Sequence, residues 1–308
     1  MGRRMLVVGE LNVDMIVSGL DTLPKLAQEI IAADLQMVLG SSSAICAAGL
    51  ARLGAEVEFL GKVGDDYFGS FVTEELRELG VGTRHVVRDP KVRTGITISL
   101  AYAQDRALVT YLGSIAALQI TDIPASILEN YDHMHVGSYF LQKGLQPGLQ
   151  DLFDLGHRTG LTTSLDTGWD PEEKWGGAKL LELIALVDVF LPNEEEACAI
   201  TGADDADLAL HELGRRAMLV VVKQGAEGAM ALHAGEIVRS PSFKVDIADT
   251  TGAGDSFDAG FLFAHIVQGQ QLEDALRFAN ACGALSTTGY GGTAAQPTLQ
   301  QVLEMLSV

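Results

Sequence analysis

The residues best suited to chemistry lie in one short segment, residues 249–257, which reads DTTGAGDSF. Gly252, Ala253 and Gly254 are small enough for the backbone to turn sharply and to approach a ligand closely. Apolar residues recur at helical spacing after residue 254, so the three small residues stand at the N-terminus of a helix. Unpaired N–H groups at such a terminus favour a phosphate or a developing oxyanion. Asp255 falls in the first turn, where its carboxylate could take the proton of a hydroxyl that attacks a phosphoryl group.

These residue types also occur in ordinary helix caps and tight turns. Asp249 or Thr251 could cap the helix, and a bare Gly-x-Gly turn before a helix most often has only this structural role. The complete nine-residue string is far more restrictive, and it resembles the second signature of the ribokinase-like (PfkB) sugar kinases. The resemblance implies that Asp255 is the catalytic base and that the backbone amides of residues 252–254 form the anion hole.

Composition and charge fit a globular enzyme. With 308 residues, the chain can bury about three-quarters of its unfolded surface, enough for one large α/β domain with a small appendage. Its net charge of −20 argues against nucleic-acid and anionic-membrane partners. Three scattered cysteines indicate a reducing compartment, no run is long enough to span a membrane, and the acidic Glu10 comes too early for a signal peptide. We therefore expect a cytoplasmic protein.

Short apolar runs alternate with amphipathic stretches along the chain. The runs predicted to be buried strands are residues 6–8, 57–60, 133–136, 163–166, 187–191 and 219–223. Helical patterns cover residues 43–53, 68–79, 145–159, 177–186, 206–215 and 258–267. This alternation predicts an α/β fold with a mostly parallel central sheet flanked by helices, and ligands bind such sheets at the carboxyl ends of the strands.

Two segments break the alternation. Residues 29–39 and 94–112 contain β-branched residues, with a tight-turn candidate at Gln104-Asp105 and no helix, so we expect an antiparallel flap. The resemblance implies a single ribokinase-like kinase domain over residues 1–308, with a small β lid formed by segments at about 12–39 and 93–113. In many relatives this lid covers the sugar and also serves as the surface of a homodimer.

Two motifs of the family bear on the sugar. The segment from Gly9 to Asp14 resembles an early sugar-contacting segment, which implies that Asn12 and Asp14 bind substrate, although an Asp after a buried strand can also cap a turn. The segment 40–54 resembles the first signature, which implies substrate contacts from Gly40, Ser41 and Ser42.

This first signature departs from the family pattern at two positions. Relatives usually carry a second glycine where this chain has Ser41, and an asparagine that reaches the sugar where it has Ile45. The serines at 41–43 could supply replacement hydroxyl donors. The departure puts ribose and other well-known substrates in doubt.

Other motifs resemble the family's nucleotide and metal sites. The Asn-x-x-Glu motif implies that Asn193 and Glu196 organise Mg²⁺ near the phosphates, although consecutive acids at a helix start also complement the helix dipole. The resemblance implies ATP contacts from Lys223, Gly225 and Gly228, where a plain hairpin is the alternative.

Three further residues are assigned by the same resemblance. Asn280 lies on a helix that would flank the adenine, and Asp249 and Thr251 are where some relatives hold a monovalent cation, which would be K⁺.

The predicted function is ATP-dependent phosphorylation of a hydroxyl of a small sugar or sugar acid. A nucleoside kinase would need aromatic groups over the base, and Tyr102, Tyr111, Tyr139 and Phe140 leave that alternative open. A non-catalytic sugar or nucleotide sensor is the alternative from another class, but a sensor would not need Asp255.

Overall fold

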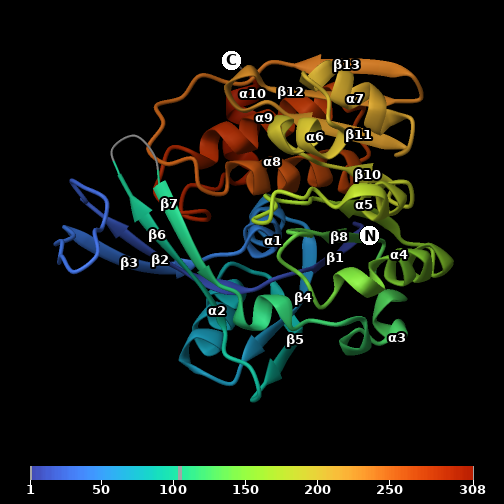
Figure 1. The fold of residues 1–308 in the computed structure, drawn as a ribbon. Helices are drawn as coiled ribbons and strands as arrows, with labels where there is room; N and C mark the ends of the chain where they lie inside the picture. Colours follow the sequence, from blue (N-terminus) through green and yellow to red (C-terminus); the bar gives the residue numbers. More distant parts are fainter. Residues whose placement is uncertain (1, 103–105, 308) are drawn as a thin grey trace.

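The computed structural model describes residues 2–102 and 106–307 (Figure 1). The tight turn expected at Gln104-Asp105 lies outside these residues. Within them, the main sheet has nine strands in the order β13-β12-β11-β10-β9-β8-β1-β4-β5. All neighbours from β5 to β11 pair in parallel, and the hairpin β12–β13 extends one edge antiparallel. The strands are β1 Arg4–Val8, β4 Glu56–Gly64, β5 Gly82–Asp89, β8 His133–Val136, β9 Thr162–Leu165, β10 Val189–Phe190, β11 Leu219–Lys223, β12 Ala229–His233 and β13 Glu236–Ser240.

The six strands expected from apolar runs are all present, so the prediction of a mostly parallel sheet is confirmed. The edge strand β5 was not predicted, because its sequence, GTRHVVRD, has few apolar residues. An edge strand needs less burial than a central one, so a hydrophobic pattern marks it weakly.

Helices cover both faces of the main sheet (Figure 1). In β1, Met5 and Val7 belong to the buried cluster shared with α1, α2, α8, α9 and α10, whereas Leu6 and Val8 belong to the cluster shared with α3 to α7. A parallel strand that is apolar on both sides is the usual sign of a sheet covered on two faces. The helices are α1 Ser42–Leu53, α2 Tyr67–Glu78, α3 Ala125–Leu128, α4 Leu149–Arg158, α5 Gly177–Ile184, α6 Glu194–Thr201, α7 Ala206–Gly214, α8 Ala253–Phe261, α9 Leu272–Ser286 and α10 Leu299–Leu306.

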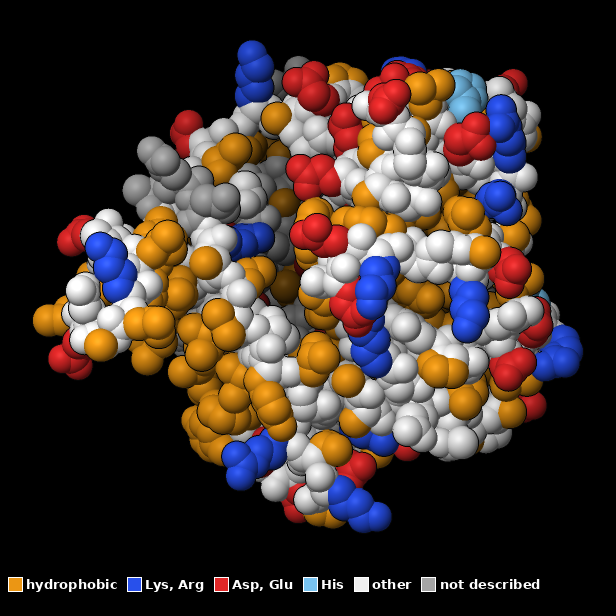
Figure 2. Space-filling model, in the orientation of Figure 1, with side chains coloured by type: hydrophobic (Ala, Val, Ile, Leu, Met, Phe, Trp, Pro, Cys, Tyr) orange, Lys and Arg blue, Asp and Glu red, His pale blue; other side chains and the backbone are white. Residues whose placement is uncertain are grey.

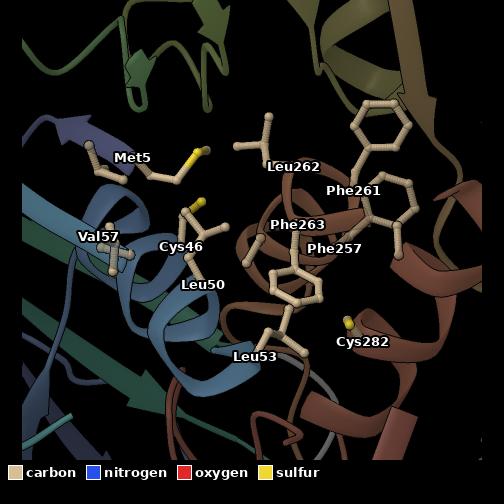
Figure 3. Packing of buried hydrophobic residues seen from close by; sticks show 14 of the residues in the cluster. Met5, Cys46, Leu50, Leu53, Val57, Phe257, Phe261, Leu262, Phe263 and Cys282 are labelled. Atoms are coloured by element: carbon tan, nitrogen blue, oxygen red, sulfur yellow. The ribbon is translucent and has the colours of Figure 1, made fainter. Parts of the chain in front are cut away.

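Close packing sets α1 beside α8. A Cβ atom on Gly49 would lie 2.8 Å from the Cβ of Ala259, so only glycine allows this approach. Cys46 and Leu50 of α1 lie toward Phe257 and Phe263 in the same buried cluster (Figure 3). The helix expected over residues 258–267 instead starts at Ala253 and continues as a π-helical segment, Leu262–Val267. The N-termini of α1 and α8 are therefore neighbours.

The four remaining strands form a separate sheet that projects from the body (Figure 1). They are β2 Asn12–Ser18, β3 Asp34–Leu39, β6 Gly95–Ala101 and β7 Arg106–Tyr111, in the order β3-β2-β6-β7. The expectation of an antiparallel flap was wrong for the central pair, because β2 and β6 are parallel. The chain enters β2 soon after β1 and β6 soon after β5, and both β1 and β5 run in the same direction in the main sheet.

The two faces of this small sheet, here called the lid, differ in polarity. Paired residues share a face, so the register places three rows of apolar residues on one face, here called the outer face, although its first row begins in the buried core with Val13 and Leu39. The rows are Leu39, Val13, Ile96 and Tyr111; Met37, Met15, Ile98 and Val109; and Leu35, Val17, Leu100 and Ala107. The opposite, inner face is mixed: it carries Asp14, Thr97, Ser99 and Arg106 together with the apolar residues Ile16, Val38 and Leu108. In the part of the chain that the structure describes, no helix combines the length and the apolar character needed to cross a membrane.

Candidate active site

The surface is hollowed between the lid, at the left of Figure 2, and the body of the molecule. The loop that starts α8 lies at this junction. Gly252 has φ = 73° at the N-cap of α8, and a Cβ on it would lie 2.8 Å from the Cα of Gly292. Gly254 is exposed, and the N–H of Ala253 donates to the carbonyl of Thr250 at 3.2 Å. The turn is thus shaped as the sequence predicted, although it uses one of the three amides assigned to the anion hole for itself.

Asp255 lies in the first turn of α8, beside the start of α1. The hydroxyl of Ser42 donates to its Oδ1 at 2.5 Å. Burial raises the pKa of Asp255 to about 6; the hydrogen bond from Ser42 and the charge of Lys223 oppose this rise, while Asp166 adds to it. The carboxylate is therefore mostly ionised at neutral pH and can still accept a proton readily.

Asn12, Asp14 and Gly40 meet where the lid joins the body. The Nδ2 of Asn12 donates to the Oδ1 of Asp14 at 3.0 Å, and a Cβ on Gly40 would lie 2.1 Å from that same oxygen. Burial raises the pKa of Asp14 to about 7, while Asn12 and the charge of Arg106 work in the opposite direction. The structure thus brings together three of the residues assigned to the substrate.

The hydroxyls of the three serines that open α1 are all engaged within the protein. Ser41 has φ = 78° and donates to the carbonyl of Glu10, while its Oγ accepts from the N–H of Ala44 at 3.0 Å. Ser43 donates to the Oε2 of Glu10 at 2.5 Å, and Ser42 bonds to Asp255 as described. Glu10 is buried, and burial raises its pKa. Ser41 and Ser43 therefore hold the start of α1 in place, and Ser42 is the serine of this group that lies against the carboxylate of Asp255.

Ile45 packs against the two glycine turns of the site. A Cβ on Gly252 would lie 3.0 Å from its Cγ2, and one on Gly292 would lie 2.3 Å from its Cδ1. Gln296 donates to the carbonyl of Ile45 at 2.8 Å. This side chain thus supports the turn before α8 by apolar contact.

A buried cluster of charges lies directly behind the turn. The Nζ of Lys223 is 2.5 Å from Asp166 Oδ2 and 3.0 Å from Asp258 Oδ2, and a Cβ on Gly254 would lie 3.7 Å from this Nζ. Burial works to lower the pKa of Lys223, but Asp166 and Asp258 outweigh it and raise the pKa well above its ordinary value. The ammonium group of Lys223, a residue assigned to ATP by resemblance, is therefore held inside the protein by the side chains of Asp166 and Asp258.

The pKa values of the two carboxyl groups shift in opposite directions. Burial acts to raise the pKa of Asp166, yet the charge of Lys223 prevails and lowers it. For Asp258, burial prevails over Lys223 and raises the pKa well above its ordinary value. Neither residue was assigned to the site from the sequence. Asp166 directly follows a buried strand and Asp258 interrupts the apolar residues of α8, and an acid in such a place usually has a partner of opposite charge.

Asn193 and Glu196 form a reciprocal cap at the start of α6. The Oδ1 of Asn193 accepts from the N–H of Glu196, and the Oε2 of Glu196 accepts from the N–H of Asn193, both at 2.9 Å. Burial, with a contribution from Asp166, raises the pKa of Glu196 to about 7, so a nearby cation would stabilise its charged form. Among residues 2–102 and 106–307, no group of three or more His, Cys, Asp or Glu side chains is arranged to hold a metal. The donor set suits Mg²⁺ that keeps most of its waters.

Gly228 and Asn280, two of the residues assigned to ATP, meet at one segment. The Nδ2 of Asn280 donates to the carbonyl of Ser240 at 3.0 Å, and a Cβ on Gly228 would lie 2.1 Å from that oxygen. Gly225 has φ = 55° in the turn between β11 and β12, so the hairpin considered as an alternative is present. These residues shape the loops beyond the carboxyl end of β11.

Asp249 and Thr251, assigned to a monovalent cation, already have a cationic partner. Asp249 Oδ1 accepts from the N–H and the hydroxyl of Thr251, at 2.9 and 2.7 Å, and Oδ2 accepts from the N–H of Gly291 at 2.9 Å. The Nη1 of Arg106 lies 3.4 Å from Asp249 Oδ1 and donates to the hydroxyl of Thr251. The guanidinium already lies beside the oxygens that a cation would bind, and a second positive charge there would be repelled by it. The pair therefore fits a bound K⁺ poorly.

Known proteins resemble the chain over almost its whole length. The model of the pfkB family of carbohydrate kinases matches residues 3–299. The chain is 32% identical to the ATP-dependent ribose-1-phosphate kinase of Halopiger xanaduensis, over 99% of this chain and 98% of that one. It is 29% identical to the ribokinase of Bacillus subtilis, over 99% and 100% of the two chains.

Solved structures give the same result for the fold. The Arabidopsis thaliana ribokinase complexed with ribose and ATP superposes with a TM-score of 0.85 at 25% identity, over 100% of both chains. A putative ribokinase II from E. coli gives a TM-score of 0.88 at 22% identity, covering 100% of this chain and 99% of that one. With its ribokinase-like fold and a family match over almost its whole length, the chain belongs to the pfkB family of carbohydrate kinases.

Proposed function

We propose that this sugar kinase transfers the γ-phosphoryl group of ATP to a hydroxyl of a small sugar or sugar acid, with Asp255 as general base. The observation that carries the proposal is the place of Asp255 within the first turn of α8, next to the exposed Gly254. Two similar proteins also support it: the Arabidopsis ribokinase is complexed with ribose and ATP, and the E. coli putative ribokinase II with ATP and Mg²⁺.

In this reaction the substrate oxygen bonds to the γ-phosphorus, the bond from that phosphorus to the β–γ bridging oxygen breaks, and ADP leaves. Asp255 accepts the proton of the attacking hydroxyl, and the N–H groups of Gly252 and Gly254 stabilise charge on the phosphoryl oxygens. Asp14 and Asn12 bind further hydroxyls of the substrate and orient it. Mg²⁺ would neutralise phosphate charge when bound, with Asn193 and Glu196 as the residues that organise it and its waters.

The test is ADP release with Mg·ATP across a panel of sugars, sugar acids, phosphosugars and nucleosides. We expect turnover on a sugar or sugar acid, and a kcat at least about 100-fold lower for Asp255→Asn. Asp274→Asn, at an exposed acid in the first turn of α9, is the matched control and should keep full activity. Turnover on a nucleoside alone would replace the proposal by a nucleoside kinase. ATP binding with no turnover would favour a sensor.

We also propose that the enzyme forms a homodimer through the outer face of its lid. Leu35, Ile98, Val109 and Tyr111 are exposed there, and hydrophobic side chains gather over the lid in Figure 2. A contiguous apolar face of this kind favours burial against a second protein surface, and both copies would offer the same face. Ile98→Lys should convert a dimer to a monomer in sedimentation; an unchanged mass would contradict this interface.

The lid dimer and the reaction are both compatible with a cytoplasmic location, which we propose as well. Among the described residues, Cys46, Cys198 and Cys282 are free thiols, as expected in a reducing compartment.

A further inference from the structure

Arg106 connects the lid to the loop that starts the anion hole. It lies on the inner face of β7, and it contacts Asp249 and Thr251, which are more than 140 positions away in the sequence. Its side chain remains 34% exposed, so the contact lies at the junction of lid and body.

Asp249 is the residue on which the geometry of this loop depends. Its two carboxylate oxygens bind Thr251 on one side and the N–H of Gly291 on the other. The neighbouring Gly292 in turn lies against Gly252 at the start of α8. A positive charge next to Asp249 therefore stabilises the ionised carboxylate that ties the two glycine turns together.

We propose that the guanidinium of Arg106 replaces a bound monovalent ion at Asp249 and Thr251, so that the kinase works without K⁺. The positive charge comes from the lid, and the loop before α8 reaches its full stability only when the lid lies against the body. The inference rests on the proposed kinase reaction, but it concerns the loop and can be tested without it.

The first measurement is turnover in KCl and in choline chloride at equal ionic strength, which keeps charge screening the same. Wild-type kcat/KM should agree within about twofold between the two salts. Arg106→Met should lose about tenfold in choline chloride, less than a direct donor to the transition state would cost, and should recover at least threefold in KCl. Arg106→Lys retains a charge at this position and should remain independent of K⁺.

The second measurement is the midpoint of thermal unfolding in the same two salts without substrate. KCl should raise the midpoint of Arg106→Met relative to choline chloride and leave wild type and Arg88→Met unchanged. Arg88 is an exposed arginine on β5, away from the loop, and serves as the matched control. This readout holds even if no substrate in the panel is turned over, so a failure of the proposed reaction remains distinguishable.

Two results would overturn the proposal. One is a wild-type protein whose turnover falls more than tenfold, or whose unfolding midpoint drops, when choline replaces K⁺. The other is an Arg106→Met variant that behaves like wild type in both salts.

Discussion

The charge of one cation acts on the pKa of each of two acids of the site, Asp14 and Asp255, but the two cations are held differently. Lys223, whose charge opposes the rise that burial causes in the pKa of Asp255, is enclosed in the body with a side chain only 10% exposed. Arg106, whose charge opposes the rise that burial causes in the pKa of Asp14, belongs to the lid and remains 34% exposed. Lys223 is thus a part of the core, whereas the effect of Arg106 depends on where the lid lies.

The difference follows from the two sheets. The main sheet is covered by helices on both faces, so a charge at the end of β11 must find its partners inside the protein. The lid has one face toward the body and one apolar face that is partly exposed. Arg106, on the face toward the body, keeps part of its side chain in contact with water. We infer that the charge acting on Asp255 is fixed in the body, whereas the charge acting on Asp14 depends on the position of the lid.

The largest expected effect is on stability. Lys223→Met leaves the ionised Asp166 buried without its cation and should lower the free energy of unfolding by about 3–5 kcal/mol. Arg106→Met removes a partly exposed pair and should cost no more than about 1 kcal/mol. Urea unfolding of both variants measures the difference. Equal losses of unfolding free energy in the two variants would contradict the difference between the buried Lys223 and the partly exposed Arg106.

A second pair of variants distinguishes the two partners of Lys223. Asp166→Asn removes a carboxylate whose pKa lies below its ordinary value, and it should cost about 3–5 kcal/mol because the buried ammonium loses its counter-charge. Asp258→Asn resembles the protonated form that its raised pKa already favours, so it should cost less than about 1 kcal/mol. If urea unfolding shows that Asp258→Asn costs more stability than Asp166→Asn, Asp258 is the ionised partner of Lys223.

Asp255→Asn should stabilise the protein while it removes activity. The folded pKa of about 6 lies above the ordinary value of 3.8, so the folded state binds the proton more tightly than the unfolded chain. The cost of burying the charge is therefore fully present above pH 6 and disappears as the pH falls toward 4. We expect a gain of about 1–3 kcal/mol in unfolding free energy at pH 7 and a smaller gain at pH 5. A loss of stability at pH 7 would contradict the raised pKa.

The smallest expected effect is on the pH dependence of the reaction. With saturating substrate, kcat should fall about tenfold per pH unit below pH 6, as Asp255 becomes protonated. At low substrate, kcat/KM should already fall below about pH 7, because Asp14 in the free enzyme becomes protonated there. Arg106→Met should raise the pH at which kcat/KM falls and leave the pH at which kcat falls unchanged, because the charge of Arg106 opposes the rise in the pKa of Asp14. If this variant shifts the pH dependence of both kcat and kcat/KM, Arg106 and Lys223 do not act on Asp14 and Asp255 separately.

Much of this arrangement could be predicted from local pattern. The buried strands, the glycine turn at the start of α8 and the position of Asp255 in the first turn of this helix depend on residue type and spacing within a few residues. The sequence also carried the alternation of the lid strands, in which Val13, Met15 and Val17 face one side and Asp14 the other. Such features are local because backbone geometry sets the periods of 3.6 and 2.

Only the tertiary structure decided which charges meet. Lys223 is 57 positions from Asp166 and 35 from Asp258, and Arg106 is 143 from Asp249. The order of strands in the two sheets brings these groups together, and it also makes β2 and β6 parallel where an antiparallel flap was expected. A local pattern records whether a residue is buried, but the partner of a buried charge depends on distances between segments that are remote in the chain.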